Sequence, residues 1–183
     1  MKIAFLGTHG VGKTTLCFEL AAALKRLDLS VDLVKEVARA CPLPINQDTT
    51  RDAQLWILHT QIAAELDLAA RYDVIVCDRA VLDNYAYLVN AAGRHPHLED
   101  LIRQWLRTYH LLVKVPVVAP PAFDGTRDVS GVFKLAIDRI IEDLLGEYGT
   151  SCLRLPAGDR SVWVSQVLDA LALPPRAPQL DLF

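Results

Sequence analysis

Short apolar runs alternate with longer amphipathic segments along most of this sequence. The apolar runs predict five strands, which lie at residues 3–6, 31–34, 74–77, 111–118 and 151–155. Between the runs, apolar residues recur at every third or fourth position, which is the period of an amphipathic helix. These helical segments lie at about residues 16–27, 50–71, 79–92, 98–106, 132–145 and 162–171. Strands that alternate with helices predict an α/β fold, in which a five-stranded parallel sheet carries helices on both faces.

The composition is that of one compact domain followed by a short tail. The chain has 183 residues, of which 52% are hydrophobic and 22% are charged, so it can bury a sizeable core. Residues 1–172 are predicted to form a single domain, and the prolines in segment 173–183 predict an extended C-terminal tail. A formal net charge of −3 gives no general attraction to nucleic acid or to an acidic membrane.

Cysteine usage and hydropathy indicate the compartment. The cysteines Cys17, Cys41, Cys77 and Cys152 are far apart and form no Cys-x-x-Cys pair. This spacing argues against a zinc site and predicts reduced thiols, most of them inside apolar segments. No apolar run approaches the length of a membrane span, and the N-terminus leads directly into a strand. We therefore expect a soluble cytoplasmic protein without a signal peptide or membrane contact.

The first strand leads into a phosphate-binding motif. Residues 7–14 read Gly-Thr-His-Gly-Val-Gly-Lys-Thr, which fits the pattern G-x-x-x-x-G-K-[ST] of a P-loop between a strand and a helix. Glycines allow positive φ angles in such a turn, and backbone N–H groups at the helix N-terminus bind phosphate. The lysine reaches the β- and γ-phosphates, and the threonine hydroxyl ligates Mg²⁺. The predicted ATP-binding residues are Gly7, Thr8, His9, Gly10, Val11, Gly12, Lys13, Thr14 and Thr15.

Charged side chains follow two of the predicted strands, at the edge where parallel sheets bind ligands. Asp78 follows the third strand and is the second predicted ligand of Mg²⁺, with Arg79 beside it as a catalytic residue that neutralises phosphate charge. Glu36 follows the second strand, where it would orient or deprotonate an attacking hydroxyl. Arg39 is predicted to bind an anionic or polar group of the substrate.

Four further residues complete the candidate site. Arg127 belongs to a polar loop, residues 120–130, with the composition of a lid whose arginine closes over transferring phosphates. Ala157 follows the last strand and is a candidate wall for the adenine ring. Gln61, in a polar stripe of the long second helix, and Tyr87 are candidate substrate-binding residues. Aromatic side chains at helical spacing are, however, more often part of a core.

These residues resemble the nucleoside and nucleotide kinase branch of P-loop proteins over the whole predicted domain. The sequence Gly-Thr-His-Gly-Val-Gly-Lys-Thr-Thr at 7–15 is similar to the P-loops of thymidylate kinases and of small kinase-like AAA-type ATPases. Asp78 and Arg79 resemble the acidic-Arg pair of deoxynucleoside and thymidylate kinases, and Glu36 matches the catalytic carboxylate of deoxynucleoside kinases. The resemblance implies a P-loop NTPase fold, a phosphate-binding role for Arg79 and a lid role for Arg127.

The sequence also departs from that family. Ala80 stands where these kinases usually carry Ser, Tyr, His or Phe, and the predicted lid has one obvious arginine instead of several. Glu36 and Arg39 resemble the Asp-x-x-Arg pair of polynucleotide 5′-kinases, with Glu in place of Asp. The identity of the phosphoryl acceptor therefore stays open.

The C-terminus carries a second resemblance. Its last five residues resemble the Gln-Leu-Ser/Asp-Leu-Phe motif with which bacterial replication and repair proteins dock on the DNA sliding clamp. Such a peptide would insert its apolar side chains into a groove while the glutamine bonds at the rim. The resemblance implies the clamp as a partner, bound through Gln179, Leu180, Asp181, Leu182 and Phe183.

Together these observations predict an ATP- and Mg²⁺-dependent phosphotransferase that acts on a nucleoside, a nucleotide or a related nucleic-acid constituent. Two alternatives remain, a clamp-associated kinase of polynucleotide 5′-hydroxyl ends and a non-kinase ATPase switch in replication or repair. ADP formation that depends on an added acceptor distinguishes a kinase from a switch. The choice between ATP and GTP and the oligomeric state, a dimer included, are left open.

Overall fold

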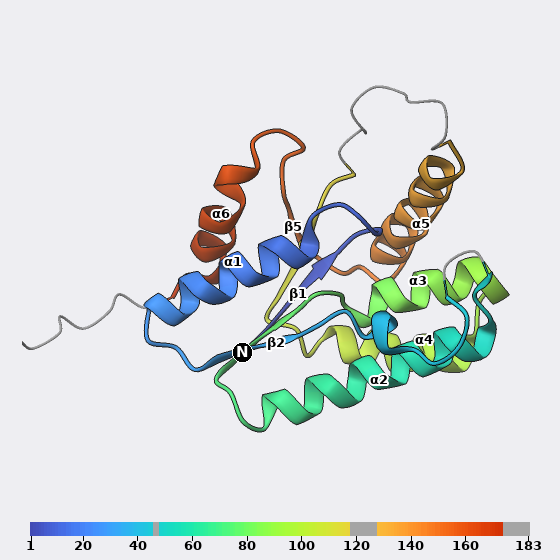
Figure 1. Ribbon diagram of the computed structural model, residues 1–183, viewed down its shortest axis with the longest axis horizontal. Helices are drawn as coiled ribbons and strands as arrows, with labels where there is room; N and C mark the ends of the chain where they lie inside the picture. The colour runs from blue at the N-terminus through green and yellow to red at the C-terminus, as the bar shows by residue number, and fades with distance from the viewer. Residues whose placement is uncertain (46–47, 118–127, 174–183) are drawn as a thin grey trace, which may run out of the picture.

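Five strands form a single sheet in the computed structural model, which describes residues 1–45, 48–117 and 128–173 (Figure 1). They are β1 (Lys2–Leu6), β2 (Val31–Val34), β3 (Val74–Cys77), β4 (Leu111–Lys114) and β5 (Leu153–Arg154). Their order across the sheet is β2-β3-β1-β4-β5. Every pair of neighbouring strands is parallel, so the predicted α/β fold with a five-stranded parallel sheet is confirmed.

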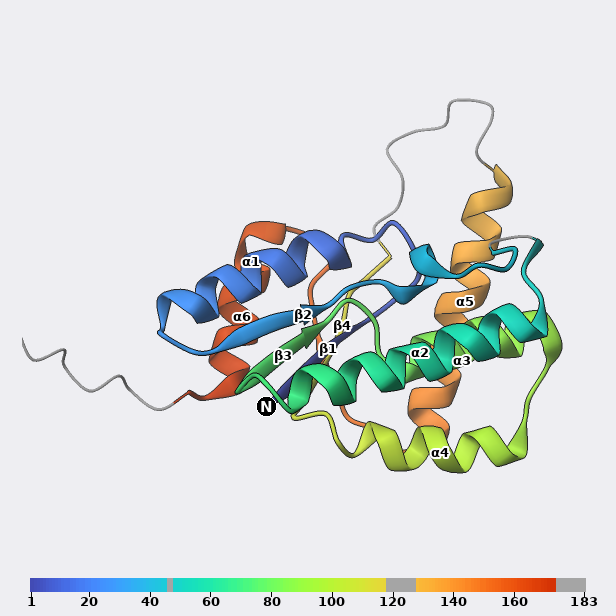
Figure 2. The same cartoon turned by 60° about the horizontal axis from the view of Figure 1, so that its bottom comes forward.

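The helices cover the two faces of this sheet. They are α1 (Lys13–Arg26), α2 (Arg51–Ala69), α3 (Val81–Ala92), α4 (Pro96–Leu106), α5 (Asp128–Glu147) and α6 (Trp163–Leu171). Two short 3₁₀ turns, η1 (Val37–Ala40) and η3 (Arg160–Val162), lie in the connections. Helices α1 and α6 lie on one side of the sheet, and α2, α3, α4 and α5 lie on the other (Figure 2).

Alternate residues of β1 contribute to two separate cores. Ile3 and Phe5 pack with α1 and α6, whereas Ala4 and Leu6 pack with α2, α3 and α5. All four side chains are fully buried, because β1 lies in the middle of the sheet and is covered on both faces. This double burial is why the strand is a continuous apolar run in the sequence.

Two strands are shorter than the sequence predicts. The predicted fourth strand ends at Lys114 instead of continuing to residue 118, because its neighbour β1 ends at Leu6 and Pro116 has no N–H to donate. The predicted fifth strand, residues 151–155, is reduced to β5, which pairs only with β4 at the edge of the sheet. Both shortened strands still end at the same edge as β1.

The connections after β2 and β3 also differ in detail from the sequence pattern. Residues 37–40, which belong to none of the predicted strands or helices, form the single turn η1. Helix α3 begins at Val81 and not at residue 79, so Asp78 and Arg79 lie in the turn between β3 and α3. This turn and η1 bring the charged residues that follow the two strands to one edge of the sheet.

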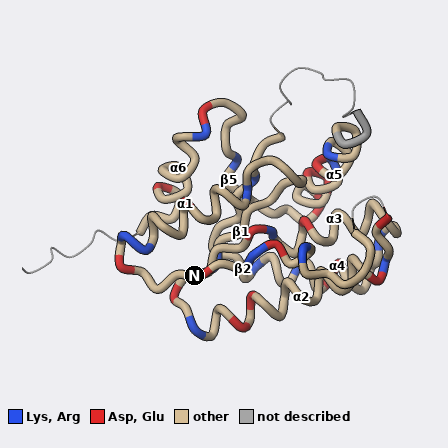
Figure 3. The backbone as a smooth tube through the Cα atoms, in the orientation of Figure 1, with Lys and Arg blue, Asp and Glu red and all other residues tan. Residues whose placement is uncertain are grey.

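Charges and thiols are distributed as in an ordinary globular domain. Basic and acidic residues are interspersed over the described elements (Figure 3). Cys17 and Cys77 are buried, Cys41 and Cys152 are half-buried, and all four are free thiols. Within the part of the chain that the structure describes, no helix combines the length and the apolar character needed to cross a bilayer.

Candidate functional site

The P-loop connects β1 to α1 at the carboxyl edge of the sheet. Gly7, Gly10 and Gly12 have φ angles of 148°, 71° and 99°, which residues with a Cβ rarely adopt. Gly12 is the N-cap of α1, and no side chain of the described residues caps the helix there. The backbone N–H groups of the first turn lack intrahelical acceptors. The loop therefore presents donors in the way that an anion site requires.

Lys13 lies inside this loop. Its Nζ donates to the carbonyl oxygens of Gly7 at 2.6 Å and Thr8 at 2.7 Å. Burial lowers the pKa of Lys13, and the positive charge of Arg79 lowers it further, so that it falls to about 8 despite three nearby carboxylates. Two carbonyl dipoles thus hold an ammonium group whose charge a bound phosphate would stabilise.

Thr14 and Asp78 meet where the Mg²⁺ site is predicted. Thr14 Oγ1 donates to Asp78 Oδ2 at 2.5 Å. Burial raises the pKa of Asp78, against the opposing effects of the Thr14 hydrogen bond and the Lys13 charge. A hydroxyl beside one carboxylate fits Mg²⁺, which takes few protein oxygens and completes its shell with water and phosphate oxygens. These two residues would hold the ion between the P-loop and the end of β3.

Glu36 and Arg79 form an ion pair at the ends of β2 and β3. Arg79 donates to Glu36 Oε1 from Nη2 at 2.7 Å and from Nε at 3.0 Å. Arg39 Nε donates to Glu36 Oε2 at 2.9 Å, although the Arg39 side chain is 75% exposed. The Arg79 guanidinium also lies over the ring of Tyr87, 4.9 Å from its centroid. The structure thus brings together the charged residues that the strand ends predict.

These cations control the ionisation of Glu36. Burial raises the pKa of Glu36, but the charge and hydrogen bonds of Arg79, together with the hydrogen bond of Arg39, outweigh burial and lower the pKa to about 2. A carboxylate with so low a pKa is a weak base at neutral pH. The geometry therefore suits Glu36 to orienting an acceptor hydroxyl by accepting its hydrogen bond, more than to removing its proton.

A cavity of about 220 Å³ opens beside this ion pair. Ile57 and Tyr87 give it apolar and aromatic walls, and Gln54 and Asn84 add carboxamide groups. Asn84 is 2% exposed, and its Nδ2 has no hydrogen-bond partner among the described residues. The same is true of Arg79 Nη1. Because an unpaired buried donor is costly, these groups mark places where a ligand would accept hydrogen bonds.

The sequence patterns predict no role for Asp83, Asn84 or Gln54. Asp83 is fully buried, and its Oδ1 accepts a hydrogen bond from the backbone N–H of Gly7 at 3.0 Å. Burial raises the pKa of Asp83, while the charges of Lys13 and Arg79 act against it. The available signal was two consecutive polar residues in the otherwise apolar start of α3. Such a pair on the buried side of a helix needs polar partners.

Gln61 lies on α2, beside the turn that carries Arg79. Its side chain is fully buried and does not line the cavity. Its Nε2 donates to the carbonyl oxygen of Arg79 at 3.0 Å and to Glu65 Oε1 at 2.9 Å. Its Nε2 is thus engaged behind the Arg79 turn, and its buried Oε1 has no hydrogen-bond partner among the described residues. A direct substrate contact by Gln61 stays a prediction. Gln61 supports the backbone from which Arg79 reaches the site.

His9 and Tyr87 make a local pair at the entrance to the cavity. The backbone N–H of His9 donates to Tyr87 Oη at 3.1 Å, and the two side chains approach at 3.2 Å between His9 Nδ1 and Tyr87 Oη. The His9 amide, predicted to face phosphate, is thus partly occupied by a hydroxyl. Tyr87 lines the 220 Å³ cavity, and its role as a substrate-binding residue stays a prediction.

A second cleft, of about 490 Å³, borders the P-loop on the other side. It lies between α1 and the η3–α6 segment, and its walls include Gly12, Thr15, Arg160 and Trp163. The Arg160 guanidinium lies 5.3 Å from the Trp163 ring centroid. Ala157 is exposed and is not among the described residues that line this cleft. The wall next to the P-loop is therefore formed by residues that follow Ala157.

Two predicted features fall outside the described residues. They are the lid arginine, Arg127, and the tail motif, residues 179–183.

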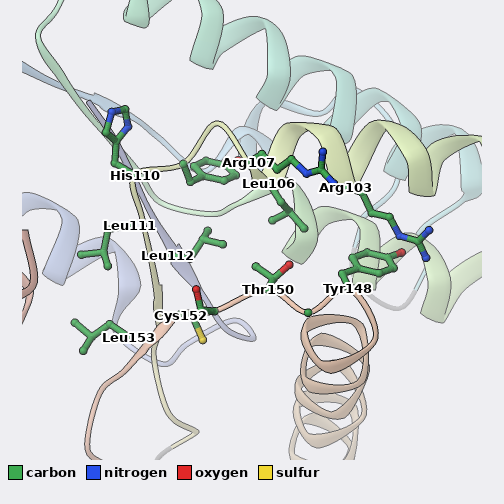
Figure 4. Close-up of a pocket in the computed structure, with 13 residues that line it drawn as sticks. Arg103, Leu106, Arg107, His110, Leu111, Leu112, Tyr148, Thr150, Cys152 and Leu153 are labelled. Carbon is green, nitrogen blue, oxygen red and sulfur yellow. The ribbon is translucent and has the colours of Figure 1, made fainter.

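A third cavity, larger than either of these clefts, lies away from all of these groups. It measures about 520 Å³ and is formed by the α4–β4 and α5–β5 connections (Figure 4). Arg103, His110, Tyr148 and Thr150 are among its lining residues, and no P-loop residue is. It adjoins the amino-terminal ends of β4 and β5, whereas open α/β sheets bind ligands beyond the carboxyl ends of their strands. Size alone therefore does not identify the site in this fold.

Comparison with known families places the chain in one of them. A family model described as an AAA domain matches residues 2–161, and the chain belongs to that family. A comparison with curated protein sequences gives no match.

Solved structures share the fold at low sequence identity. Thymidylate kinase from Ehrlichia chaffeensis aligns with a TM-score of 0.69 and 17% identity, over 93% of this chain and 98% of that chain. Deoxyadenosine kinase from M. mycoides, solved with the products dCMP and dCDP, aligns with a TM-score of 0.63 and 16% identity, over 94% and 99%. The same enzyme with bound dATP aligns with a TM-score of 0.59 and 16% identity, over 94% of this chain and 100% of that chain. These likenesses show the fold.

Proposed function

We propose that this AAA-family chain transfers the γ-phosphoryl group of Mg-ATP to a nucleoside, a nucleotide or a related nucleic-acid constituent. The observation that carries the proposal is the convergence of Lys13, the Thr14–Asp78 pair and the Glu36–Arg79 pair at one edge of the sheet. One side of this arrangement suits a triphosphate, and the 220 Å³ cavity suits a small polar acceptor. The solved kinases of similar fold are named for acceptors of this class.

The proposed reaction is an in-line displacement at the γ-phosphorus. An acceptor oxygen forms a bond to the γ-phosphorus while the bond to the β,γ-bridging oxygen breaks, and ADP leaves with that electron pair. Glu36 orients the attacking hydroxyl, whose proton passes to the carboxylate or to solvent. Lys13 and Arg79 donate to the phosphoryl oxygens, and Arg127 is proposed as a further donor. Mg²⁺, when bound, would neutralise charge on the β- and γ-phosphates.

The two clefts divide the substrates between them. The acceptor is proposed to lie against Tyr87, with the Asn84 and Gln54 carboxamides bonding its polar edge. Arg39, which projects outward from η1, is placed to contact an anionic group on that acceptor. The adenine ring of ATP is proposed to lie in the 490 Å³ cleft next to Thr15. This division leaves the γ-phosphate between the P-loop and the acceptor.

An acceptor screen tests the proposal. ATP labelled at the γ-phosphate is incubated with Mg²⁺ and with nucleosides, deoxynucleoside monophosphates or 5′-hydroxyl oligonucleotides. We expect label on a mononucleoside or monophosphate. Transfer should fall about 10²-fold in Glu36→Gln, because the acceptor is then less well oriented, while ATP affinity is retained. The matched control is Asp143→Asn, an exposed carboxylate on α5, which should stay within about twofold of wild type.

Two other outcomes correspond to the alternative functions. Label confined to oligonucleotide ends would indicate a polynucleotide 5′-hydroxyl kinase, an alternative that the Glu36–Arg39 pair favours. Slow hydrolysis that no acceptor stimulates would indicate an ATPase switch, an alternative that the AAA-domain match favours. Either result would contradict the proposal that the acceptor is a mononucleoside or a nucleoside monophosphate.

We also propose that the tail recruits the enzyme to a bacterial DNA sliding clamp. Support comes from the sequence, since residues 179–183 follow a proline-rich segment that disfavours helix. The test is titration calorimetry of the full chain against purified clamp. Replacing both Leu182 and Phe183 by Ala should weaken binding about 30-fold or more, because such apolar anchors carry most of the energy of a small interface. Arg176→Ala is the matched control, and equal binding by all variants would contradict the proposal.

A further inference from the structure

Helix α5 brings a lysine to the outer side of the P-loop. Near the start of this helix, Phe133 packs beside the loop. Its ring centroid lies 5.8 Å from that of His9 and 6.0 Å from that of Tyr87. Farther along, Ile137 and Ile141 are fully buried in the core. Because these contacts fix both the position and the rotation of α5, the residue after Phe133 has a defined direction.

That residue is Lys134. A Cβ added to Gly10 would lie 3.2 Å from Lys134 Nζ and 3.8 Å from Lys134 Cε. The ammonium group therefore sits directly over the turn of the P-loop. Its charge acts on the loop. Burial is the largest cause of the lowered pKa of His9, and the positive charge of Lys134 is the second largest.

The neighbouring turn of α5 is held at the same edge of the sheet. Asp138, one helical turn after Lys134, accepts a hydrogen bond from Lys114 Nζ at 2.6 Å. Lys114 ends β4, so this pair of a buried lysine and a half-buried aspartate anchors α5 beside the strand end. Helix α5 thus presents Lys134 to the P-loop, and the lysine side chain is half-buried.

Lys134 and Lys13 approach the loop from different directions. Lys13 lies inside the loop and donates to its carbonyl oxygens, whereas Lys134 lies over Gly10 from α5. With Arg79 they place three cationic side chains around one short turn. Part of the charge on Lys13 and Arg79 is offset by the carboxylates of Glu36, Asp78 and Asp83. The backbone N–H groups of the loop add to the attraction that Lys134 exerts on a bound phosphate.

We propose that Lys134 is a phosphate-binding residue that contacts the terminal phosphate of the bound nucleoside triphosphate. The inference rests on the proposed function, and it adds a residue that the sequence motifs do not include. A charged donor on this contact is worth about 10-fold or more in affinity. Lys134 would therefore distinguish a triphosphate from nucleotides that lack the terminal phosphate.

Titration calorimetry with three ligands tests this role. The ligands are AMP, ADP and the β,γ-imido analogue of ATP, each with Mg²⁺. Lys134→Ala should weaken the analogue about 10-fold and change AMP by less than about twofold. Lys134→Arg, which keeps the charge, should recover most of the loss. Arg139→Ala, an exposed cation on the same helix, is the matched control and should bind all three ligands as wild type does.

Three results would overturn the inference. If Lys134→Ala binds the analogue as tightly as wild type does, the contact is absent. If it weakens AMP as much as the analogue, the lysine acts on the shape of the site and not on the terminal phosphate. In both cases wild-type binding of the analogue leaves the proposed function intact. If wild type binds none of the three ligands, the proposed function and this inference fail together.

Discussion

At the scale of single residues, the Lys13 ammonium is held by two carbonyl groups in a buried position that disfavours its charge. Its pKa is lowered to about 8, so in the free protein it is charged at neutral pH and mostly neutral about one unit above that pKa. If phosphate binds only to the charged form, the apparent Kd for Mg-ATP should rise about tenfold between roughly pH 7 and pH 9.

Calorimetric titration at a series of pH values checks this dependence. The matched control is Lys13→Arg, because a guanidinium stays charged over this range and its Kd should be independent of pH. A lysine with the ordinary pKa of about 10.4 would also give a constant wild-type Kd up to roughly pH 9. A constant wild-type profile would therefore contradict the lowered pKa.

Single site residues were predictable where they follow a local motif and less so where they depend on helix position. Gln54 and Gln61 lie two turns apart on one stripe of α2, yet Gln54 lines the cavity and Gln61 lies behind Arg79. A separation of seven residues is about 10 Å along a helix. The hydrophobic period gives the face on which both lie, but it gives no position along the sheet edge. That position comes from packing.

At the scale of elements, a buried polar cluster joins β1, α2 and α4 beneath the Arg79 turn. Glu65 is 1% exposed and accepts four hydrogen bonds from different parts of the chain. Lys2 Nζ, Trp105 Nε1 and Tyr109 Oη each donate to it at 2.7 Å, and Gln61 Nε2 donates at 2.9 Å. Glu65→Ala should therefore reduce the free energy of unfolding by about 3–5 kcal/mol, since it removes the carboxylate partner of the buried Lys2 cation and the acceptor of Trp105 Nε1 and Tyr109 Oη.

Urea denaturation measures this loss, and the same helix offers a matched control. Asp67 is an exposed carboxylate on α2 that pairs with Arg71, and Asp67→Ala should change the free energy of unfolding by less than about 1 kcal/mol. If Glu65→Ala changes the free energy of unfolding by a similarly small amount, the cluster contributes little to the stability of the fold. Apart from the polar stripe of α2, no sequence pattern indicates this cluster, because its members lie up to 107 positions apart along the chain, from Lys2 to Tyr109.

At the scale of the whole molecule, the parallel sheet and its binding edge followed from the alternation of strands and helices. The strand order did not, because periodicity carries no information on which strands are neighbours. β1 pairs with β3 and β4, and this order places the P-loop between Asp78 and the end of β4. The lengths of β4 and β5 also depend on how far the neighbouring strands extend. The apolar runs in the sequence therefore predict longer strands than the structure contains.

The two cores also bear on where the domain ends. The core on the α1–α6 side includes Leu171 and Leu173 as partly buried members, one residue beyond the predicted boundary at 172. Prolines at 174, 175 and 178 disfavour regular structure after that point. We therefore predict that a chain ending at Leu173 keeps its midpoint of thermal unfolding within about 2 °C of wild type, because a loss of about 1 kcal/mol shifts the midpoint of a domain of this size by only a few degrees. Its affinity for Mg-ATP should stay within about twofold of wild type.

Calorimetric unfolding of two truncated chains tests the boundary. A chain ending at Ala170 is the matched control, because it also loses the packing of Leu171 and Leu173. Two partly buried leucines contribute about 1–3 kcal/mol, so this chain should unfold several degrees lower. If the chain ending at Leu173 is destabilised as much as the control, the tail packs on its own domain. That result would argue against clamp docking, because the same apolar side chains cannot fill two grooves at once.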